Sequence, residues 1–187
     1  MRRLRPSLIT MALIFPLFTL VQAGNTARAG NYSTEGFVFF TNVRQATQPG
    51  ALVPYIGYGS SPQIGPHYQS GAILVTSGLT PVDATTFTFT GVVGPNPYMP
   101  NHPKIHLITT NYGNLFCTWT ATFTLKIINT NGDAILSGDG AFTVVGGTGR
   151  YRNAYGSFQT LFQTSPVPHG ANDASATVTE KGTIRVR

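Results

Sequence analysis

The chain has 187 residues, of which 41% are hydrophobic and 10% are charged, and its formal net charge is +6. This weakly charged, aromatic-rich composition excludes an intrinsically disordered protein, and the length suits one domain with a sizeable core. Cys117 is the single cysteine and excludes an intramolecular disulfide, so stability has to come from packing and closure of a sheet.

Residues 1–29 have the pattern of a secretory signal peptide. Three arginines precede the apolar run Leu8–Val21, and two small-x-small cleavage sites follow it. The run is shorter than the roughly 20 residues of a membrane span, and Pro16 interrupts it, so a stable membrane anchor is the less favoured alternative. We therefore expect a mature domain at 30–187, secreted to an extracellular or periplasmic location.

Cleavage of this segment would remove four of the 12 basic residues, so the mature domain would have a formal charge of only +2. The basic residues that remain are scattered along the chain and form no dense patch. The sequence therefore predicts no nucleic-acid partner.

The first strand is expected at Thr34–Val43. Glu35 there shares its alternation phase with Phe37 and Phe39, which would place its carboxylate on an apolar face. The next segment, Gln45–Ser70, is rich in proline, glycine and tyrosine. Because proline blocks ladder pairing, we expect a long, stiff loop there.

Strands are then expected at 71–76, 85–93 and 104–110, with a second proline-rich loop at 94–103. Long ordered loops on a rigid scaffold often carry function. The two loops would either cover one end of the domain or also contact a ligand, and the sequence leaves both possibilities open.

The alternation of apolar and polar side chains is clearest from Leu115 to Ile127. Its odd positions are apolar and its even positions are mostly threonine, which predicts a long strand with one buried face. Cys117 falls on that face, as a core residue rather than a catalytic thiol. Asn131–Gly132 then predicts a hairpin turn.

Three more strands are expected at 134–145, 154–163 and 174–186, which brings the total to eight. No segment has helical periodicity, so the fold class is all-β. An antiparallel sheet of this size either closes into a barrel or splits into a sandwich, and periodicity alone does not choose between them.

The last strand places a second carboxylate, Glu180, in phase with Ala176 and Val178. A carboxylate on an inner face has to be paired or has a raised pKa, which is how a general acid or base arises in an apolar cavity. Glu35 and Glu180 are therefore the catalytic candidates. The alternatives are a bulge that reverses the phase, a strand end in solvent, or a structural pair with Arg150 or Arg152.

Other kinds of site are weakly supported. His102 and His106 are four residues apart, but Pro103 opposes a helix, and on a strand they would lie about 13 Å apart, so we expect no metal site. The glycine-rich run at 146–149 lacks the lysine and the following helix of a phosphate loop. No serine-nucleophile motif is present.

The segment Phe142–Gly156 contains Val-Val-Gly-Gly-Thr-Gly followed by a basic residue, an aromatic residue and Arg152. It resembles the matching segment of plant dirigent proteins and is similar, more loosely, to a turn of allene oxide cyclases. The resemblance implies one eight-stranded antiparallel β-barrel with an apolar cavity, no metal or organic cofactor, and a trimeric assembly. Tyr155 departs from the pattern, since dirigent proteins have arginine there.

Dirigent proteins direct the coupling of phenolic radicals, and allene oxide cyclases isomerise an unsaturated fatty-acid epoxide. The resemblance therefore implies a secreted barrel that binds a small apolar or phenolic molecule. A cofactor-free isomerase or cyclase that uses a cavity carboxylate, and a structural extracellular protein with a filled barrel, are the alternatives. The residues expected to contact a ligand are Tyr98, His102, His106, Arg152 and Tyr155.

Overall fold

The computed structural model describes residues 28–186, which form an antiparallel β structure with two short 3-10 helices. Residues 1–27, which hold most of the predicted signal peptide, lie outside the described part. The strands are β1 (Arg28–Phe40), β2 (Leu52–Ser61), β3 (Gly65–Val75), β4 (Thr80–Pro81), β5 (Thr86–Val93), β6 (His106–Thr110), β7 (Gly113–Ile127), β8 (Ala134–Gly147), β9 (Tyr155–Thr164) and β10 (Ala174–Val186), and the helices are η1 (Val43–Gln45) and η2 (Gly149–Tyr151).

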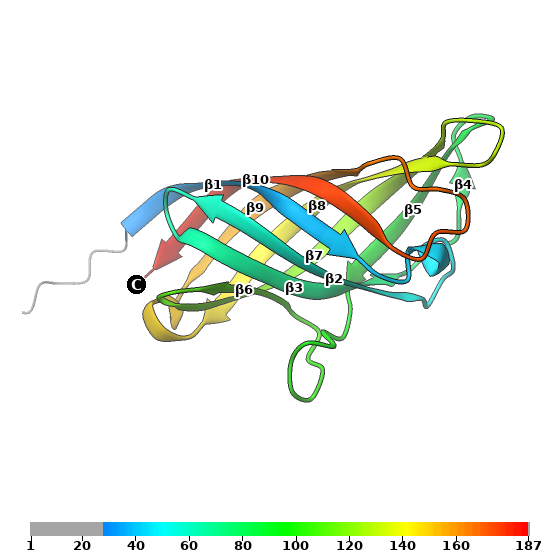
Figure 1. The fold of residues 1–187 in the computed structure, drawn as a ribbon. Helices are drawn as coiled ribbons and strands as arrows, with labels where there is room; N and C mark the ends of the chain where they lie inside the picture. Colours follow the sequence, from blue (N-terminus) through cyan, green and yellow to red (C-terminus); the bar gives the residue numbers. More distant parts are fainter. Residues whose placement is uncertain (1–27, 187) are drawn as a thin grey trace, which may run out of the picture.

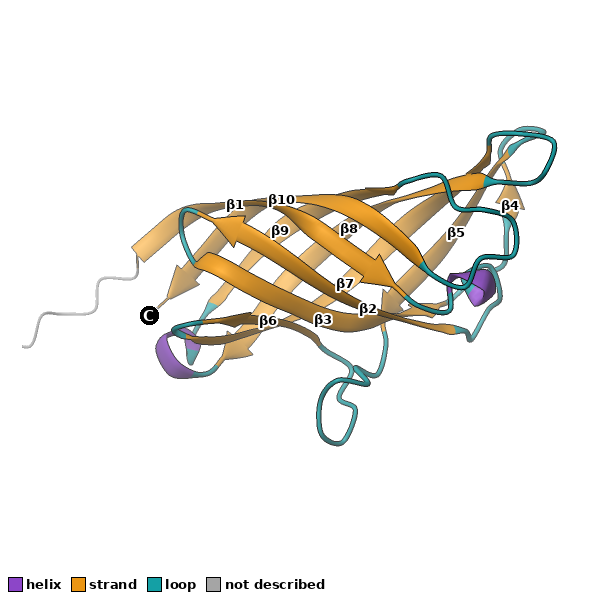
Figure 2. Cartoon of the chain, viewed as in Figure 1, coloured by secondary structure: helices purple, strands orange, loops and turns teal. Residues whose placement is uncertain are grey.

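Eight of the strands form a closed ring, in the order β2-β1-β10-β9-β8-β7-β6-β3, and β3 pairs again with β2. Figures 1 and 2 show the ring as an elongated body with loops at both ends. The predicted all-β antiparallel architecture is confirmed. Because each strand of the ring has a neighbour on both sides, the ring leaves few unpaired edge groups.

Strands β5 and β6 share one position in the ring, between β3 and β7. β6 pairs with the first part of β7 and with 67–70 of β3, whereas β5 pairs further along, with 120–126 of β7 and 73–75 of β3. The segment 94–105 joins these two strands and projects from the ring in Figure 1. The fold therefore interrupts one side of the ring and sends a loop out through the interruption.

The side chains alternate between the interior and the outside, as the sequence predicted for β7. Four odd positions of β7 are buried, namely Leu115, Cys117, Trp119 and Phe123, and Cys117 is fully buried. Aromatic rings fill much of the interior: Trp119 stacks on Phe142, which stacks on Phe158, and Phe89 stacks on Phe123. Stacked and tilted ring pairs of this kind stabilise a core beyond their buried area.

The prediction of a long loop at 45–70 is wrong, because β2 and the first half of β3 occupy most of this segment as a hairpin. Two of its prolines fit because they lie just outside the stretch that pairs with a second strand. Pro54 lies just before the first β2 residue that pairs with β1, and Pro66 lies just before the first β3 residue that pairs with β6. A proline is tolerated at such positions, since its missing N–H removes no ladder bond.

The second predicted loop, 94–103, is present. Asn96 is fully buried and holds the loop to the ring: its side-chain amide donates to the carbonyl of Ser70, and its side-chain oxygen accepts from the backbone N–H of Tyr98. Asn101 and His102 have positive φ angles at the tip of this loop. The loop is thus anchored at its base, and His102 stays exposed at its end.

The glycine run at 146–149 joins β8 to β9 through η2, as the sequence predicted for a strand connection. Gly149 has a φ of +56°, and a Cβ atom there would lie 2.5 Å from the carbonyl oxygen of Tyr112. Glycine is required because the turn packs directly against the β6–β7 backbone. Within residues 28–186, no helix has the length and apolar character needed to cross a bilayer.

Candidate functional site

A small cavity of about 50 Å³ lies inside the ring. Its walls are mostly aromatic and aliphatic side chains, and a few polar groups from β2, β3, β6, β9 and β10 also line it. The lining residues are Val38, Phe40, Tyr55, Gln69, Ile73, His106, Trp119, Ala121, Phe123, Gly140, Phe142, Thr160, Phe162, Val178 and Glu180.

Glu180 is the charged group of this cavity, and its side chain is only 1% exposed. The Tyr32 hydroxyl donates to Oε2 at 2.5 Å, and the Gln69 amide donates to Oε1 at 3.2 Å. Both carboxyl oxygens therefore have a neutral donor. A buried carboxylate persists only when its oxygens are satisfied in this way.

Burial raises the pKa of Glu180 from its ordinary value to about 7. The donors from Tyr32 and Gln69, together with the nearby Thr160 hydroxyl, oppose this rise because they stabilise the ionised form. The pKa of the Tyr32 hydroxyl is raised by its own burial and by the neighbouring carboxylate. At neutral pH Glu180 thus exists in both protonation states, and Tyr32 stays protonated.

His67 extends this polar cluster toward the β2–β3 turn. Its Nδ1 donates to the carbonyl of Gly65 at 2.9 Å, and the Gln69 amide approaches its Nε2 at 3.4 Å. Gly59 makes room for the ring, because a Cβ atom at that position would lie 2.6 Å from Nε2 of His67. A glycine on the inner face of β2 therefore positions a histidine on β3.

A second polar cluster consists of His106, Tyr55 and Trp119. The Tyr55 hydroxyl lies 2.7 Å from Nδ1 of His106 and accepts from the Trp119 indole N–H at 3.2 Å. Gly71 makes room for the tyrosine, since a Cβ atom there would lie 2.5 Å from the hydroxyl oxygen. Three strands, β2, β6 and β7, thus bring one donor–acceptor chain to the cavity wall.

Burial lowers the pKa of His106 to about 3, with a smaller contribution from the neighbouring His67. His106 is 1% exposed and is neutral at physiological pH. Its Nε2 atom has no hydrogen-bond partner among residues 28–186. An unpaired buried polar atom is costly, so its presence in a cavity wall marks a position where a ligand can bind.

The structure brings two of the predicted site residues, Glu180 and His106, to the same cavity. The predicted inward placement of Glu35 is wrong: its side chain is exposed, and so are Phe37 and Phe39 in the same phase. The inner phase of β1 is the even one, which contains Tyr32 and Val38. The two phenylalanines that share the phase of Glu35 therefore lie on the outer face.

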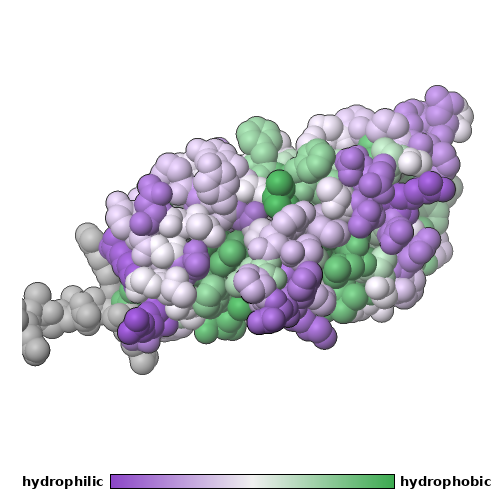
Figure 3. All heavy atoms as spheres, turned by 60° about the horizontal axis from the view of Figure 1, so that its bottom comes forward, coloured by the Kyte–Doolittle hydropathy of each residue, from purple (hydrophilic) through white to green (hydrophobic). Residues whose placement is uncertain are grey.

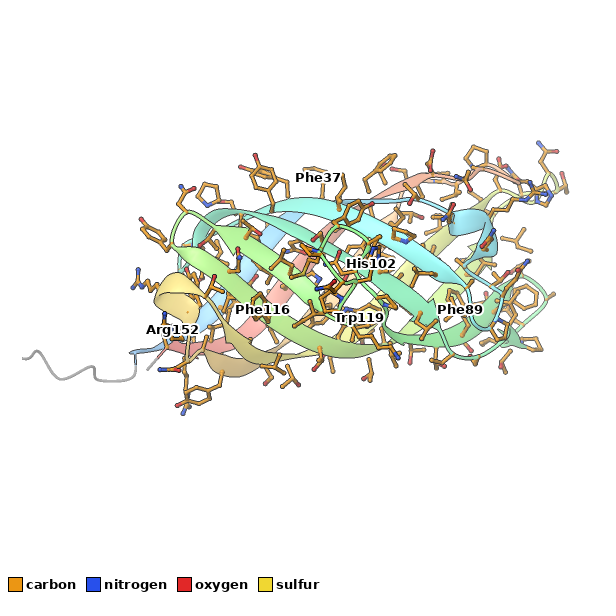
Figure 4. All side chains as sticks on the ribbon, turned by 90° about the horizontal axis from the view of Figure 1, so that it is seen from below. Phe37, Phe89, His102, Phe116, Trp119 and Arg152 are labelled. Carbon is orange, nitrogen blue, oxygen red and sulfur yellow. The ribbon has the colours of Figure 1, made fainter. Side chains whose placement is uncertain are left out.

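The other four predicted residues, Tyr98, His102, Arg152 and Tyr155, do not line the cavity. Tyr98 and His102 lie on the exposed loop between β5 and β6, and Arg152 is exposed beside η2 at one end of the ring. Figure 4 shows Arg152 at that end and Phe37 pointing away from the ring. Tyr155 is half-buried at the start of β9.

Sequence reasoning missed Tyr32, Tyr55, Gln69 and Trp119 as members of the site. The signal for Tyr32 was its even phase in β1, shared with Val38 and Phe40. The signal for Tyr55 and Gln69 was the alternation inside the segment 45–70, which its prolines and glycines obscured.

Within residues 28–186, no three histidine, cysteine, aspartate or glutamate side chains gather closely enough to hold a metal ion. Comparison with protein-family models and with curated protein sequences finds no match to this chain.

Proposed function

We propose that this chain is a secreted β-barrel, similar to allene oxide cyclases and dirigent proteins, that binds a small apolar or phenolic molecule in its interior. The closed ring of eight strands and the segment Phe142–Gly156 support the resemblance. The observation that carries the function is the apolar cavity on which Glu180, His106 and Tyr55 converge. Ligand sites are typically apolar cavities with a few convergent polar groups.

The size of the cavity limits the ligand. Its volume of about 50 Å³ is below the roughly 150 Å³ of a cavity that binds benzene. A molecule of a few heavy atoms is the natural occupant, and a phenol enters only if lining side chains move. Phe162 and Ala121 are the half-buried members of the lining, so the wall has most freedom near them.

The test is a titration with phenol, observed through Trp119, which is the only tryptophan of the chain and lines the cavity. Binding would shift the indole N–H resonance in a saturable way. Ala121→Leu fills the cavity and abolishes the shift, whereas Leu161→Ala, on the exposed face of β9, leaves it unchanged. If wild-type protein gives no saturable shift with phenol or with acetone, the interior is only a filled core, which favours a structural extracellular protein.

The pKa of Glu180 favours a second candidate, a cofactor-free isomerase. A general base is most effective when its pKa is close to the operating pH, and burial brings this carboxyl to about 7. The reaction would begin when ionised Glu180 removes a proton from a carbon next to a carbonyl group. The carboxyl would then return a proton to the enolate at another position.

Exchange of the methyl hydrogens of acetone in D₂O tests this chemistry without knowledge of the natural substrate. The isomerase predicts exchange that is faster with wild-type protein than with Glu180→Gln. Glu35→Gln is the matched control, because it makes the same change on the outer face of β1. Equal exchange rates for wild type and Glu180→Gln would eliminate the isomerase and leave the binding proposal standing.

We also propose that the chain self-associates through the outside of β1, β2 and β3. Large side chains there are 45–67% exposed and line one shallow groove together with Tyr98; we call this set the outer aromatic face: Phe37, Phe39, Ile56, Tyr58, Tyr68 and Tyr98. In Figure 3, green apolar side chains gather near the middle of the upper edge of the molecule, among pale neighbours.

The face suits a second copy of the same chain because its six members are all uncharged. Phe37 pairs with Tyr58 across β1 and β2, and Tyr58 packs against Tyr68 at 5.7 Å between ring centroids. Six half-exposed side chains of this size offer roughly 600 Å². That approaches the roughly 800 Å² that each partner contributes to a standard interface.

A further inference from the structure

The hydrogen bonds of the second polar cluster have a fixed direction. Trp119 has only an N–H to offer, so the Tyr55 hydroxyl oxygen is the acceptor of that bond. The hydroxyl proton of Tyr55 then points to its other partner, Nδ1 of His106, at 2.7 Å. Nδ1 is therefore an acceptor, and a neutral imidazole whose Nδ1 accepts carries its proton on Nε2.

The N–H at Nε2 is the unpaired end of this series of hydrogen bonds. His106 is almost completely buried and lines the cavity, and Nε2 contacts no acceptor among residues 28–186. Burial also opposes protonation of the ring, which keeps Nδ1 available as the acceptor of Tyr55. The cavity wall thus presents one fixed donor.

The carboxyl group at the other polar position does not offer an equivalent free donor. Both oxygens of Glu180 already accept from protein groups, Oε2 from Tyr32 and Oε1 from Gln69. The Trp119 N–H is also used, by Tyr55. Two buried side-chain atoms of the wall lack a partner among residues 28–186: Nε2 of His106 and the hydroxyl oxygen of Thr160. The hydroxyl can donate or accept, so the group whose direction is fixed is the His106 donor, and its complement is an acceptor oxygen.

We propose that the cavity selects small apolar molecules that carry a carbonyl or ether oxygen, which the Nε2–H of His106 binds. This inference rests on the proposed binding function and gives it a ligand class. Tyr55 acts as a positioning residue, because it holds the imidazole in the tautomer that donates to the ligand. A pure hydrocarbon would leave the N–H unpaired, and a ligand whose only polar group is a donor would meet another donor.

The first test measures the tautomer in the full chain without ligand. Long-range ¹H–¹⁵N correlation of the His106 ring at pH 7 should show a protonated Nε2 and an unprotonated Nδ1. Tyr55→Phe removes the hydroxyl that selects this tautomer, so the ring should become a mixture of both forms. A wild-type ring that carries its proton on Nδ1 would overturn the inference and leave the question of cavity binding open to the phenol titration.

The second test compares acetone with 2-methylpropene, which have the same shape and differ in the carbonyl oxygen. The dissociation constants are measured through the Trp119 indole resonance. His106→Leu should reduce the affinity for acetone relative to 2-methylpropene by about tenfold, the effect of one hydrogen bond. Leu161→Ala, on the exposed face of β9, removes no group from the lining and should leave this ratio unchanged.

Tyr55→Phe should also lower the acetone preference, by less than His106→Leu, and it keeps the histidine in place. An unchanged preference in both variants would overturn the role of Nε2 while the binding function remains. If wild type binds neither probe nor phenol, the proposed function itself fails, and the ligand class falls with it.

Discussion

The inner and outer faces of β1, β2 and β3 both contain side chains that are unusual for their environment, although most of the inner side chains are apolar. On the inside, β1 and β3 contribute Tyr32, His67 and Gln69, all of them buried and joined by hydrogen bonds that lead to Glu180. On the outside, the same strands expose Phe37 and Tyr68, at 65% and 67%. Polar groups are thus buried where the fold gives them partners, and aromatic groups are exposed on a surface suited to another molecule.

This contrast shows what each face requires of the sequence. A buried polar group is stable only with a partner, so the inner face depends on accurate positions from several strands. An exposed apolar patch costs little in the monomer and matters for association, since patches of a few hundred Å² often mark binding surfaces. Substitutions on the two faces should therefore change different properties.

The largest expected effect is the pH dependence that Glu180 imposes on stability. Its pKa is about 7 in the folded chain against an ordinary 4.5, so the folded state binds the proton more tightly. The free energy of unfolding should therefore fall, through this group, as pH rises from about 4.5 to 7. The free energy of unfolding of Glu180→Gln, measured relative to that of wild type, should therefore rise by about 3 kcal/mol between pH 4.5 and pH 7.

Urea unfolding at several pH values measures this difference. Subtracting the wild-type curve from the Glu180→Gln curve removes the opposite contribution of His106, whose lowered pKa of about 3 costs stability as pH falls below 6.5. Glu35→Gln, on the outer face, should give a flat difference curve. A flat curve for Glu180→Gln as well would remove the distinction between the two carboxylates.

The next effect concerns the space that glycines leave on the inner face. Gly71→Ala would place a Cβ atom 2.5 Å from the Tyr55 hydroxyl oxygen and displace the residue that orients His106. We expect a loss of about 2 kcal/mol, the usual size of overpacking. Gly78→Ala, where the nearest heavy atom is 3.8 Å away, is the control and should be neutral. Comparable urea midpoints for the two variants would contradict the close fit of this cluster.

Tyr32→Phe tests the direct partner of Glu180 and should have a smaller effect. The loss of this donor leaves Oε2 unsatisfied and should cost about 1–2 kcal/mol at pH 8, where the carboxylate is mostly ionised. At pH 5 the loss should be smaller, because the protonated carboxyl demands less from its neighbours. A loss that is independent of pH would indicate that Tyr32 acts only through packing with Phe158.

The smallest effect on the stability of the single chain is expected on the outer aromatic face. Phe37→Ser and Tyr68→Ser together should change monomer stability by no more than about 1 kcal/mol, since exposed substitutions are usually near neutral. They should nevertheless convert an oligomer to a monomer in light scattering coupled to size-exclusion chromatography. Leu161→Ser is the control, because it removes an apolar side chain that is 51% exposed on β9, outside this face. A wild-type chain that is monomeric at high concentration would refute self-association through this face.

The alternation of apolar and polar side chains predicted the inner face well in β7 and β10, where threonine alternates with apolar residues. It placed Glu180 and Cys117 correctly in the interior. It misplaced Glu35 because Phe37 and Phe39, which share its phase, are exposed. Alternating aromatic residues give the same sequence pattern on a buried face and on an exposed face that binds a partner. The prolines and glycines of 45–70 hid β2 and half of β3. Pro54 is tolerated because pairing with β1 begins only at the next residue. Gly59 and Gly71 leave space for side chains on the adjacent strand, and such contacts between strands are not visible in the sequence pattern.

The central claim is that the ring encloses a polar site whose carboxyl group is shielded from water. The most direct test is the pH titration of the ¹³Cδ resonance of Glu180 in the full chain. The buried site predicts an apparent pKa of about 7 for this carboxyl. A value close to the ordinary 4.5 would show that Glu180 is solvated, and would contradict both the enclosed cavity and the functions proposed for it.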